Sequence, residues 1–140
     1  MKKTKVLITG VGGFIGRNVM NYLATKPDLE VFGSLCRLPW VTEIWPSGND
    51  NLREADLLNK RSALSISRGA DVIIHAAATS AGAKYIVENP GFILDNTTIN
   101  TNILEAAHAN GVKHLIFLSC SVIYPMVLER PANESDLDYN

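Results

Sequence analysis

The stretch that decides the fold lies near the start of the chain and reads Lys5-Val6-Leu7-Ile8-Thr9-Gly10-Val11-Gly12-Gly13-Phe14-Ile15-Gly16. A short apolar run turns through glycines into a stripe of helical spacing that continues to Leu23, which is typical of a buried strand leading into a helix. The glycines allow a tight turn, close approach of the backbone to a pyrophosphate, and close packing of helix on strand. The helix would also direct free N–H groups at the phosphates. The stretch therefore predicts a dinucleotide site, and the alternative is a glycine-rich turn with a purely structural role.

Short apolar runs and helical patterns alternate along the rest of the chain, which indicates a parallel sheet with crossover helices. Right-handed crossovers predict an α/β fold, a doubly wound parallel sheet with strand order 3-2-1-4-5. Ligands of such sheets bind at the carboxyl ends of the strands, here strands 1 and 4. We expect residues 1–140 to form one dinucleotide-binding domain. The expected strands are residues 5–9, 30–36, 52–55, 72–76 and 115–119, and the expected helices are 13–25, 59–67 and 90–110.

The composition argues against several classes of protein. Of the 140 residues, 46% are hydrophobic and 19% charged, with a net charge of −1, so no basic excess predicts a nucleic-acid partner. The first apolar run breaks at Thr9-Gly10, too early for a signal peptide, and no segment approaches membrane-spanning length. Cys36 and Cys120 are expected to be reduced thiols of a cytoplasmic protein. The histidines lack metal-ligand spacing, so no metal is predicted, and His75 is interpreted as a core histidine.

The end of the second expected strand bears on the choice of cofactor. NAD sites usually place a carboxylate about 20 residues past the glycines, where it binds the ribose hydroxyls. Counting from Gly16 reaches Cys36, with Arg37 beside it and no acid nearby in the sequence. An arginine can pair with a 2′-phosphate, so NADP is predicted, with NAD as the alternative. The other interpretation of Arg37 is a solvated surface side chain.

Later motifs follow the glycine stretch in a fixed order. They are Ala76-Ala77-Ala78 after the fourth expected strand, then Ser119-Cys120-Ser121-Val122-Ile123-Tyr124-Pro125 after the fifth. Together the motifs resemble the extended short-chain dehydrogenase/reductase family, the NAD(P)-dependent epimerases and dehydratases of nucleotide sugars. The loop with Gly82, the run Glu88-Asn89-Pro90 before Asn96, and Pro131-Ala132-Asn133-Glu134-Ser135 are most similar to the GDP-fucose synthase branch, the GDP-4-keto-6-deoxymannose epimerase-reductases.

The resemblance implies a role for each matching position. The glycine stretch would hold the pyrophosphate, Asp56-Leu57 would lie along the adenine, and the three alanines would pass under the ribose and nicotinamide. Asp56 could instead cap the following helix. Asn96 would help to organise the active site or would simply face solvent. With Arg37 included, the expected cofactor-binding residues are Thr9, Gly10, Gly13, Phe14, Ile15, Gly16, Arg37, Asp56, Leu57, Ala76, Ala77, Ala78 and Asn96.

The catalytic positions depart from the family pattern. Relatives use a Ser or Thr to polarise the substrate oxygen, four positions before the motif tyrosine, and here that position is Cys120. A thiol donates hydrogen bonds weakly, so Cys120 and the adjacent Ser121 are the candidate catalytic residues. By the resemblance, the family's Tyr-x-x-x-Lys pair would fall beyond Asn140, and the substrate domain is expected to be absent from these 140 residues. The one match to that spacing, Tyr22 to Lys26, lies on the first helix, on the wrong side of the fold.

Three interpretations of function remain open. The first is the NADP(H)-binding domain of a nucleotide-sugar epimerase/reductase that resembles GDP-fucose synthase. The others are a non-catalytic dinucleotide-binding module and a fragment of an NAD-dependent nucleotide-sugar epimerase/dehydratase. The expected partners are a nucleotide-sugar substrate in the full-length enzyme and a second copy of the chain. Relatives dimerise through the helix expected at 90–110, and here that helix carries apolar residues on more than one face.

Overall fold

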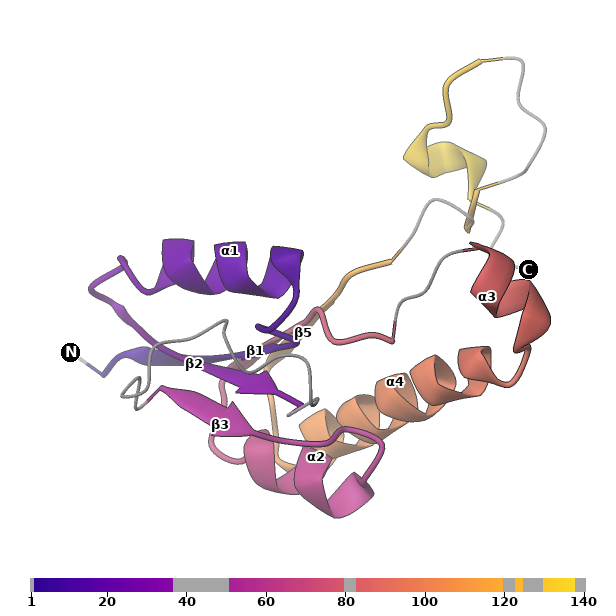
Figure 1. Cartoon of the computed structure of the whole chain (residues 1–140). Helices are drawn as coiled ribbons and strands as arrows, with labels where there is room; N and C mark the ends of the chain where they lie inside the picture. Colours follow the sequence, from indigo (N-terminus) through magenta and orange to yellow (C-terminus); the bar gives the residue numbers. More distant parts are fainter. Residues whose placement is uncertain (1, 37–50, 80–82, 120–122, 125–129, 138–140) are drawn as a thin grey trace.

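A five-stranded parallel sheet forms the centre of the molecule, in the order β3-β2-β1-β4-β5 (Figure 1). The computed structural model describes residues 2–36, 51–79, 83–119, 123–124 and 130–137. The predicted fold class and strand order are confirmed. The strands are β1 (Thr4–Thr9), β2 (Leu29–Leu35), β3 (Leu52–Glu54), β4 (Val72–His75) and β5 (His114–Phe117).

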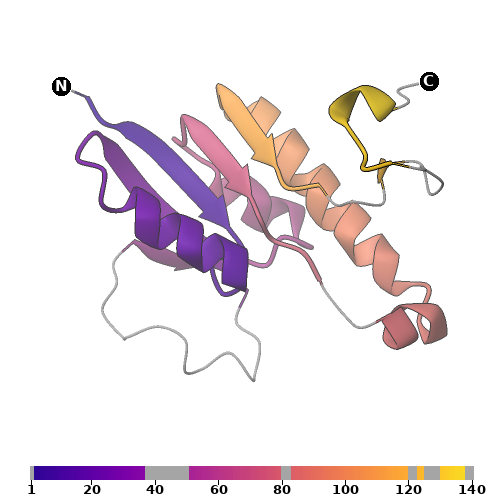
Figure 2. The same cartoon turned by 90° about the horizontal axis from the view of Figure 1, so that it is seen from above.

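Helices cover both faces of the sheet. Helix α1 (Phe14–Leu23) lies on one face, and α2 (Lys60–Ile66) and α4 (Phe92–Ala109) lie on the other (Figures 1 and 2). Because successive side chains of a strand point to opposite faces, β1 contributes to two cores. Val6 and Ile8 pack with Met20 of α1, whereas Leu7 packs with Ile103 of α4. Both cores exclude water, which explains the unbroken apolar run of β1.

The helices differ from the expected ones in two respects, an additional short helix and the residue that caps α2. A short helix, α3 (Ala83–Glu88), precedes α4 and was not predicted. Asn59 caps α2, because its side chain accepts hydrogen bonds from the N–H groups of Arg61 and Ser62. The alternative role of Asp56 as that cap is therefore wrong.

Helix α4 ends where expected, and Gly111 after it adopts a positive φ of 66°. No helix in the described ranges combines the length and apolarity that crossing a membrane requires.

Asp71 joins three strands at the amino ends of the sheet. Its Oδ2 accepts a hydrogen bond from the N–H of Lys5 at 3.0 Å, and its Oδ1 lies 2.7 Å from Nζ of Lys113. Its backbone carbonyl accepts from the N–H of Lys113 at 2.9 Å. Hydrogen bonds from Lys113 and from the Lys5 backbone hold the pKa of Asp71 below its ordinary 3.8. The carboxylate therefore links the starts of β1, β4 and β5 on the side away from the glycine loop.

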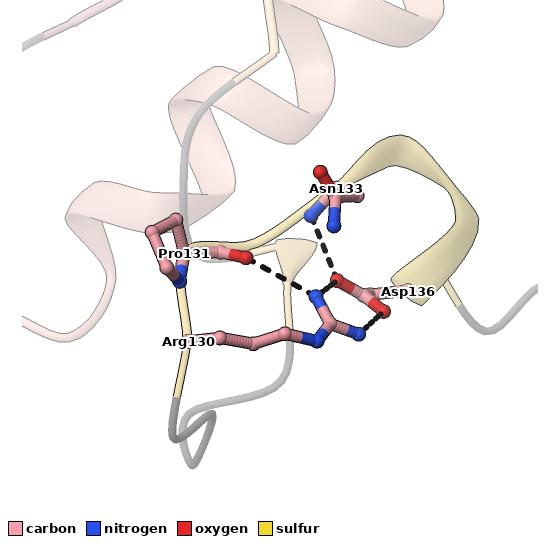
Figure 3. Close-up of polar contacts among 4 residues, drawn as sticks. All are labelled: Arg130, Pro131, Asn133 and Asp136. Carbon is pink, nitrogen blue, oxygen red and sulfur yellow. Dashed lines mark hydrogen bonds and ion pairs between the residues drawn. The ribbon is translucent and has the colours of Figure 1, made fainter.

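The segment 130–137 forms a self-contained turn that both overall views draw clear of the sheet (Figures 1 and 2). The guanidinium of Arg130 pairs with both carboxylate oxygens of Asp136, at 2.6 and 2.8 Å, and also donates to the carbonyl of Pro131 (Figure 3). The N–H of Asn133 donates to Asp136 at 2.7 Å. These bonds lower the pKa of Asp136. Hydrogen bonds and an ion pair among its own residues thus hold the turn.

Candidate functional site

The two motifs that the sequence singles out meet at the middle of the sheet. Thr9, the last residue of β1, pairs with His75, the last residue of β4. The glycine loop follows β1, and the alanines 76–78 follow β4. The strand order reverses between β1 and β4, the position at which doubly wound sheets bind ligands. The structure therefore brings together segments separated by more than sixty residues, as the Thr9–His75 pair shows.

Gly10 interlocks the two segments. Its φ of +72° is a conformation that favours glycine, and a Cβ there would lie 2.6 Å from Cα of Ala77 and 2.7 Å from the carbonyl oxygen of Ala76. A Cβ on Gly16 would overlap the backbone of Gly10. Both glycines are needed for the loop to pack between the end of β4 and the first turn of α1.

Gly13 differs from these two glycines because it is exposed and a Cβ there would approach only one atom closely. It is exposed and has extended backbone angles, φ −84° and ψ 169°, that any residue can adopt. The nearest atom to a Cβ placed there is the carbonyl oxygen of Gly10, at 3.3 Å. Gly13 is also the N-cap of α1, where no side chain caps the helix and no acid occupies its first turn. The helix start therefore has N–H groups available to an anion.

Exposed apolar side chains flank this helix start. Phe14 is 78% exposed and Ile15 54% exposed, so both lie at the surface beside the glycine loop. Thr9, by contrast, is fully buried, and its hydroxyl accepts hydrogen bonds from the N–H groups of Ala76 and Ala77, both at 3.2 Å. The Thr9 side chain therefore has no exposed surface through which to contact a ligand.

Asn96 of α4 holds the segment after the alanines. Its Oδ1 accepts from the N–H of Thr79 at 2.8 Å, and its Nδ2 donates to the carbonyl of Thr79 at 2.9 Å. The side chain is half-buried, so the interpretation that it simply faces solvent does not hold. Asn96 instead fixes both backbone polar groups of Thr79, in the segment that follows β4.

The turn after β3 exposes Asp56 but not Leu57. Asp56 is exposed and its Oδ1 accepts from the N–H of Leu58 at 3.0 Å, whereas the Leu57 side chain packs in the core. Leu58 is exposed, so Asp56 and Leu58 provide the accessible surface of this turn. Asn102 of α4 donates to the carbonyls of Leu57 and Leu58, at 2.8 and 3.1 Å. Sequence reasoning missed this contact, and its only signal was an asparagine among the apolar residues of the buried helix face.

Two carboxylates from elsewhere in the sequence, Glu54 and Asp56, lie close enough to the end of β2 to act on Cys36. Cys36, just past β2, is an exposed free thiol. Burial raises its pKa above the ordinary 9.0, and the charges of Asp56 and Glu54 raise it further. These acids come from β3 and the turn after it. Arg37, Cys120 and Ser121, which carry the NADP and catalytic predictions, lie outside the described residues.

The Tyr22–Lys26 match is a surface contact at the opposite end of α1. Nζ of Lys26 lies 4.2 Å from the centre of the Tyr22 ring, which is largely exposed. The carbonyl of Lys26 accepts from the N–H of Leu29, the first residue of β2. The pair is therefore remote from the glycine loop, as predicted. Within the described ranges, no three His, Cys, Asp or Glu side chains gather as a metal site would require.

Comparison with known proteins identifies the family. The profile of the NAD dependent epimerase/dehydratase family matches residues 6–140. The chain belongs to this family. Among curated epimerase/dehydratase relatives, GDP-mannose 3,5-epimerase 1 of Oryza sativa subsp. japonica is 31% identical over 135 residues, covering 96% of this chain and 35% of the relative. GDP-L-fucose synthase of Escherichia coli (strain K12) is 32% identical over 143 residues, covering 98% of this chain and 39% of the relative.

A solved structure of the superfamily shares the fold. A short-chain dehydrogenase/reductase superfamily protein from Agrobacterium tumefaciens with bound NAD superposes with a TM-score of 0.66 and 26% identity, covering 86% of this chain and 34% of that chain. The present epimerase/dehydratase family member thus spans between a third and two-fifths of the length of the curated relatives described above.

Proposed function

We propose that this chain is the NADP(H)-binding domain of a nucleotide-sugar epimerase/reductase similar to GDP-L-fucose synthase. The observation that carries the proposal is the interlock of Gly10 with Ala76 and Ala77 beside the uncapped start of α1. The family membership supports a nicotinamide cofactor, and both curated relatives are named for GDP-linked sugars. We infer a GDP-linked sugar as the substrate of the complete enzyme.

The Gly13→Val substitution tests the proposal directly. The valine side chain would occupy the space in front of the α1 start without demanding an unusual backbone conformation. Gly91→Val is a control for a valine at another helix N-cap without a side-chain cap. A Cβ on Gly91 meets nothing within 4 Å, whereas one on Gly13 would press on the carbonyl oxygen of Gly10 at 3.3 Å. Calorimetry should show that Gly13→Val loses both NADP(H) and NAD(H) binding while Gly91→Val keeps it, with similar circular dichroism spectra. Retained binding by the Gly13→Val protein would remove the main support for the proposal.

The choice between NADP and NAD depends on opposing charges. Arg37 supports NADP, whereas the carboxylates of Asp56 and Glu54 make the end of β2 less favourable for a 2′-phosphate. We expect Arg37→Ala to weaken NADP(H) binding and to leave NAD(H) binding nearly unchanged. Equal losses for the two cofactors would rule out contact between Arg37 and the 2′-phosphate.

A further inference from the structure

Three polar side chains from three elements form a buried chain of hydrogen bonds behind the glycine loop. Oγ1 of Thr9 on β1 lies 2.7 Å from Nδ1 of His75 on β4, and Nε2 of His75 lies 3.0 Å from Oδ1 of Asn100 on α4. Thr9 is 0% and His75 2% exposed. The interpretation of His75 as a satisfied core histidine is confirmed, but its partners belong to the candidate site.

The direction of each hydrogen bond follows from the Thr9 hydroxyl. Its oxygen already accepts from the N–H groups of Ala76 and Ala77, which uses both of its lone pairs. The Thr9 hydrogen must therefore point at His75, so Nδ1 of His75 is the acceptor. The ring proton is then on Nε2, where it donates to Oδ1 of Asn100. The contacts thus select a neutral imidazole in a single tautomer.

We propose that His75 is a positioning residue for the dinucleotide: as the Nε2–H tautomer it orients the Thr9 hydroxyl, which keeps Ala76 and Ala77 packed against Gly10. This inference rests on the proposed function, because its effect is measured at the nucleotide. Gly10 and Ala77 are in close contact, since Cα of Ala77 lies only 2.6 Å from where a Cβ of Gly10 would be. A shift of the alanines would therefore also move the glycine loop.

Protonation of His75 would break this arrangement. The described contacts of the ring are with groups that do not titrate: Thr9 from β1, Phe117 from β5 with ring centres 5.8 Å apart, and Asn100 from α4. No charged group in the described part of the chain is among the causes of the shift in its pKa. Burial lowers the pKa of His75 below its ordinary 6.5, and the Asn100 bond offsets part of that effect. A proton on Nδ1 would give the Thr9 oxygen a third donor, so a bond to Ala76 or Ala77 would be lost. Nucleotide affinity should therefore fall as the pH falls through the pKa of His75.

The first test is spectroscopic and needs no ligand. In the ¹⁵N spectrum of the free protein at neutral pH, His75 should show an unprotonated Nδ1 and a protonated Nε2. The opposite tautomer, or a charged ring, would overturn the inference. If the wild-type chain binds neither NADP(H) nor NAD(H), the proposed function fails, and this spectrum still decides whether the hydrogen-bond chain exists.

The second test separates positioning from simple core stability. His75→Leu removes the acceptor for Thr9 and should weaken NADPH binding roughly tenfold, the effect of about one hydrogen bond. His75→Gln keeps an acceptor and a donor but does not titrate, so it should restore most of the affinity. His108→Gln, at an exposed position of α4, is the matched control and should bind as the wild type does. A folded His75→Leu protein with wild-type affinity would contradict the proposal.

The pH dependence keeps the proposal testable even where His75→Leu does not fold. The affinity of the wild type should decline at acid pH relative to that of His75→Gln, and the comparison cancels any titration of the nucleotide itself. Parallel profiles, over the whole range in which the wild type stays folded, would overturn the positioning role.

Discussion

At the scale of single residues, Asn102 stabilises the turn after β3 that contains Asp56. Its amide group is buried and donates to the backbone carbonyls of Leu57 and Leu58, and the bond to Leu57 is itself buried. Asn102→Ala should lower the free energy of unfolding by about 1–3 kcal/mol, the usual effect of leaving a buried acceptor without a partner. Asn102→Asp should cost more, because a carboxylate would face both carbonyl oxygens.

Urea unfolding measures this effect, and Asn18→Ala provides the control. Asn18 also donates to a backbone carbonyl, that of Phe14, but at an exposed position of α1. Its replacement should change the free energy of unfolding by no more than about 0.5 kcal/mol. Equal losses at the two positions would mean that burial of the carbonyls at the β3 turn is not what makes Asn102 important.

At the scale of elements, the link between Asp71 and the starts of three strands predicts a dependence of stability on pH. The pKa of Asp71 is lowered in the folded protein, so its contribution is present above the ordinary value of 3.8 and is lost as the pH falls through the folded value. Asp71→Asn should therefore be less stable than the wild type near neutral pH, and the difference should shrink in acid. Asp28→Asn, which removes an exposed acid near the start of β2, serves as the control in urea unfolding at several pH values. A difference that stays constant down to acid pH would contradict the prediction.

Helix α4 also presents apolar side chains that the sheet does not cover. Ile93 is 56% and Leu104 52% exposed, and eleven residues of separation place them on one helix face three turns apart. We propose that a second copy of the chain packs on this face in a two-fold dimer. The double substitution Ile93→Glu with Leu104→Glu should yield a monomer in sedimentation velocity, whereas Tyr22→Glu on α1 should not change the assembly. A monomeric wild type at high concentration would contradict the dimer.

At the scale of the whole molecule, we expect the 140-residue chain to bind NADPH without turning over a nucleotide sugar. By the family resemblance, Cys120 is expected at the position of the relatives' Ser or Thr. The one Tyr-x-x-x-Lys match lies at the far end of α1. General acid–base catalysis contributes about 10²–10⁴-fold, so without it the rate should be near background. Cys120→Ser alone should not restore activity.

NADPH absorbance measured with GDP-4-keto-6-deoxymannose and the purified chain tests this expectation. Binding without oxidation is the expected result, and it would also agree with a non-catalytic dinucleotide-binding module. Measurable oxidation would refute the expectation and would mean that Tyr124, Tyr139 or a partner chain supplies the proton.

The sequence predicts the sheet well because its signals are local. Apolar runs mark β1, β2, β4 and β5, whereas β3 (Leu52–Glu54) has only one apolar residue. The right-handed crossover rule then gives the order of the strands. Gly111 likewise marks the end of α4 by itself. Helix α3 escaped prediction because it is only six residues long, and the ring of Tyr85 packs against Phe92 of the next helix, a contact that no periodic pattern reveals.

The polar contacts of the site could not be predicted for a different reason. Each of the asparagines at 96, 100, 102 and 110 of the α4 region bonds to a group between 17 and 46 residues away. A sequence shows the asparagine but not its partner, so only Asn96 was singled out, through the family resemblance. Leu57 shows the converse limit, because the motif that suggested an adenine contact also fits a core leucine.

The segment after β4 has a consequence for hydrogen exchange. The amides of Ala76, Ala77 and Thr79 lie past the end of the strand, yet each donates to a side chain, Thr9 or Asn96, rather than to solvent. Their protons should exchange slowly with deuterium, at rates set by the opening of β1 and α4 rather than by local fraying. The exchange rates of these three amides would then report on the opening of β1 and α4. Binding of a dinucleotide should slow exchange at all three amides together.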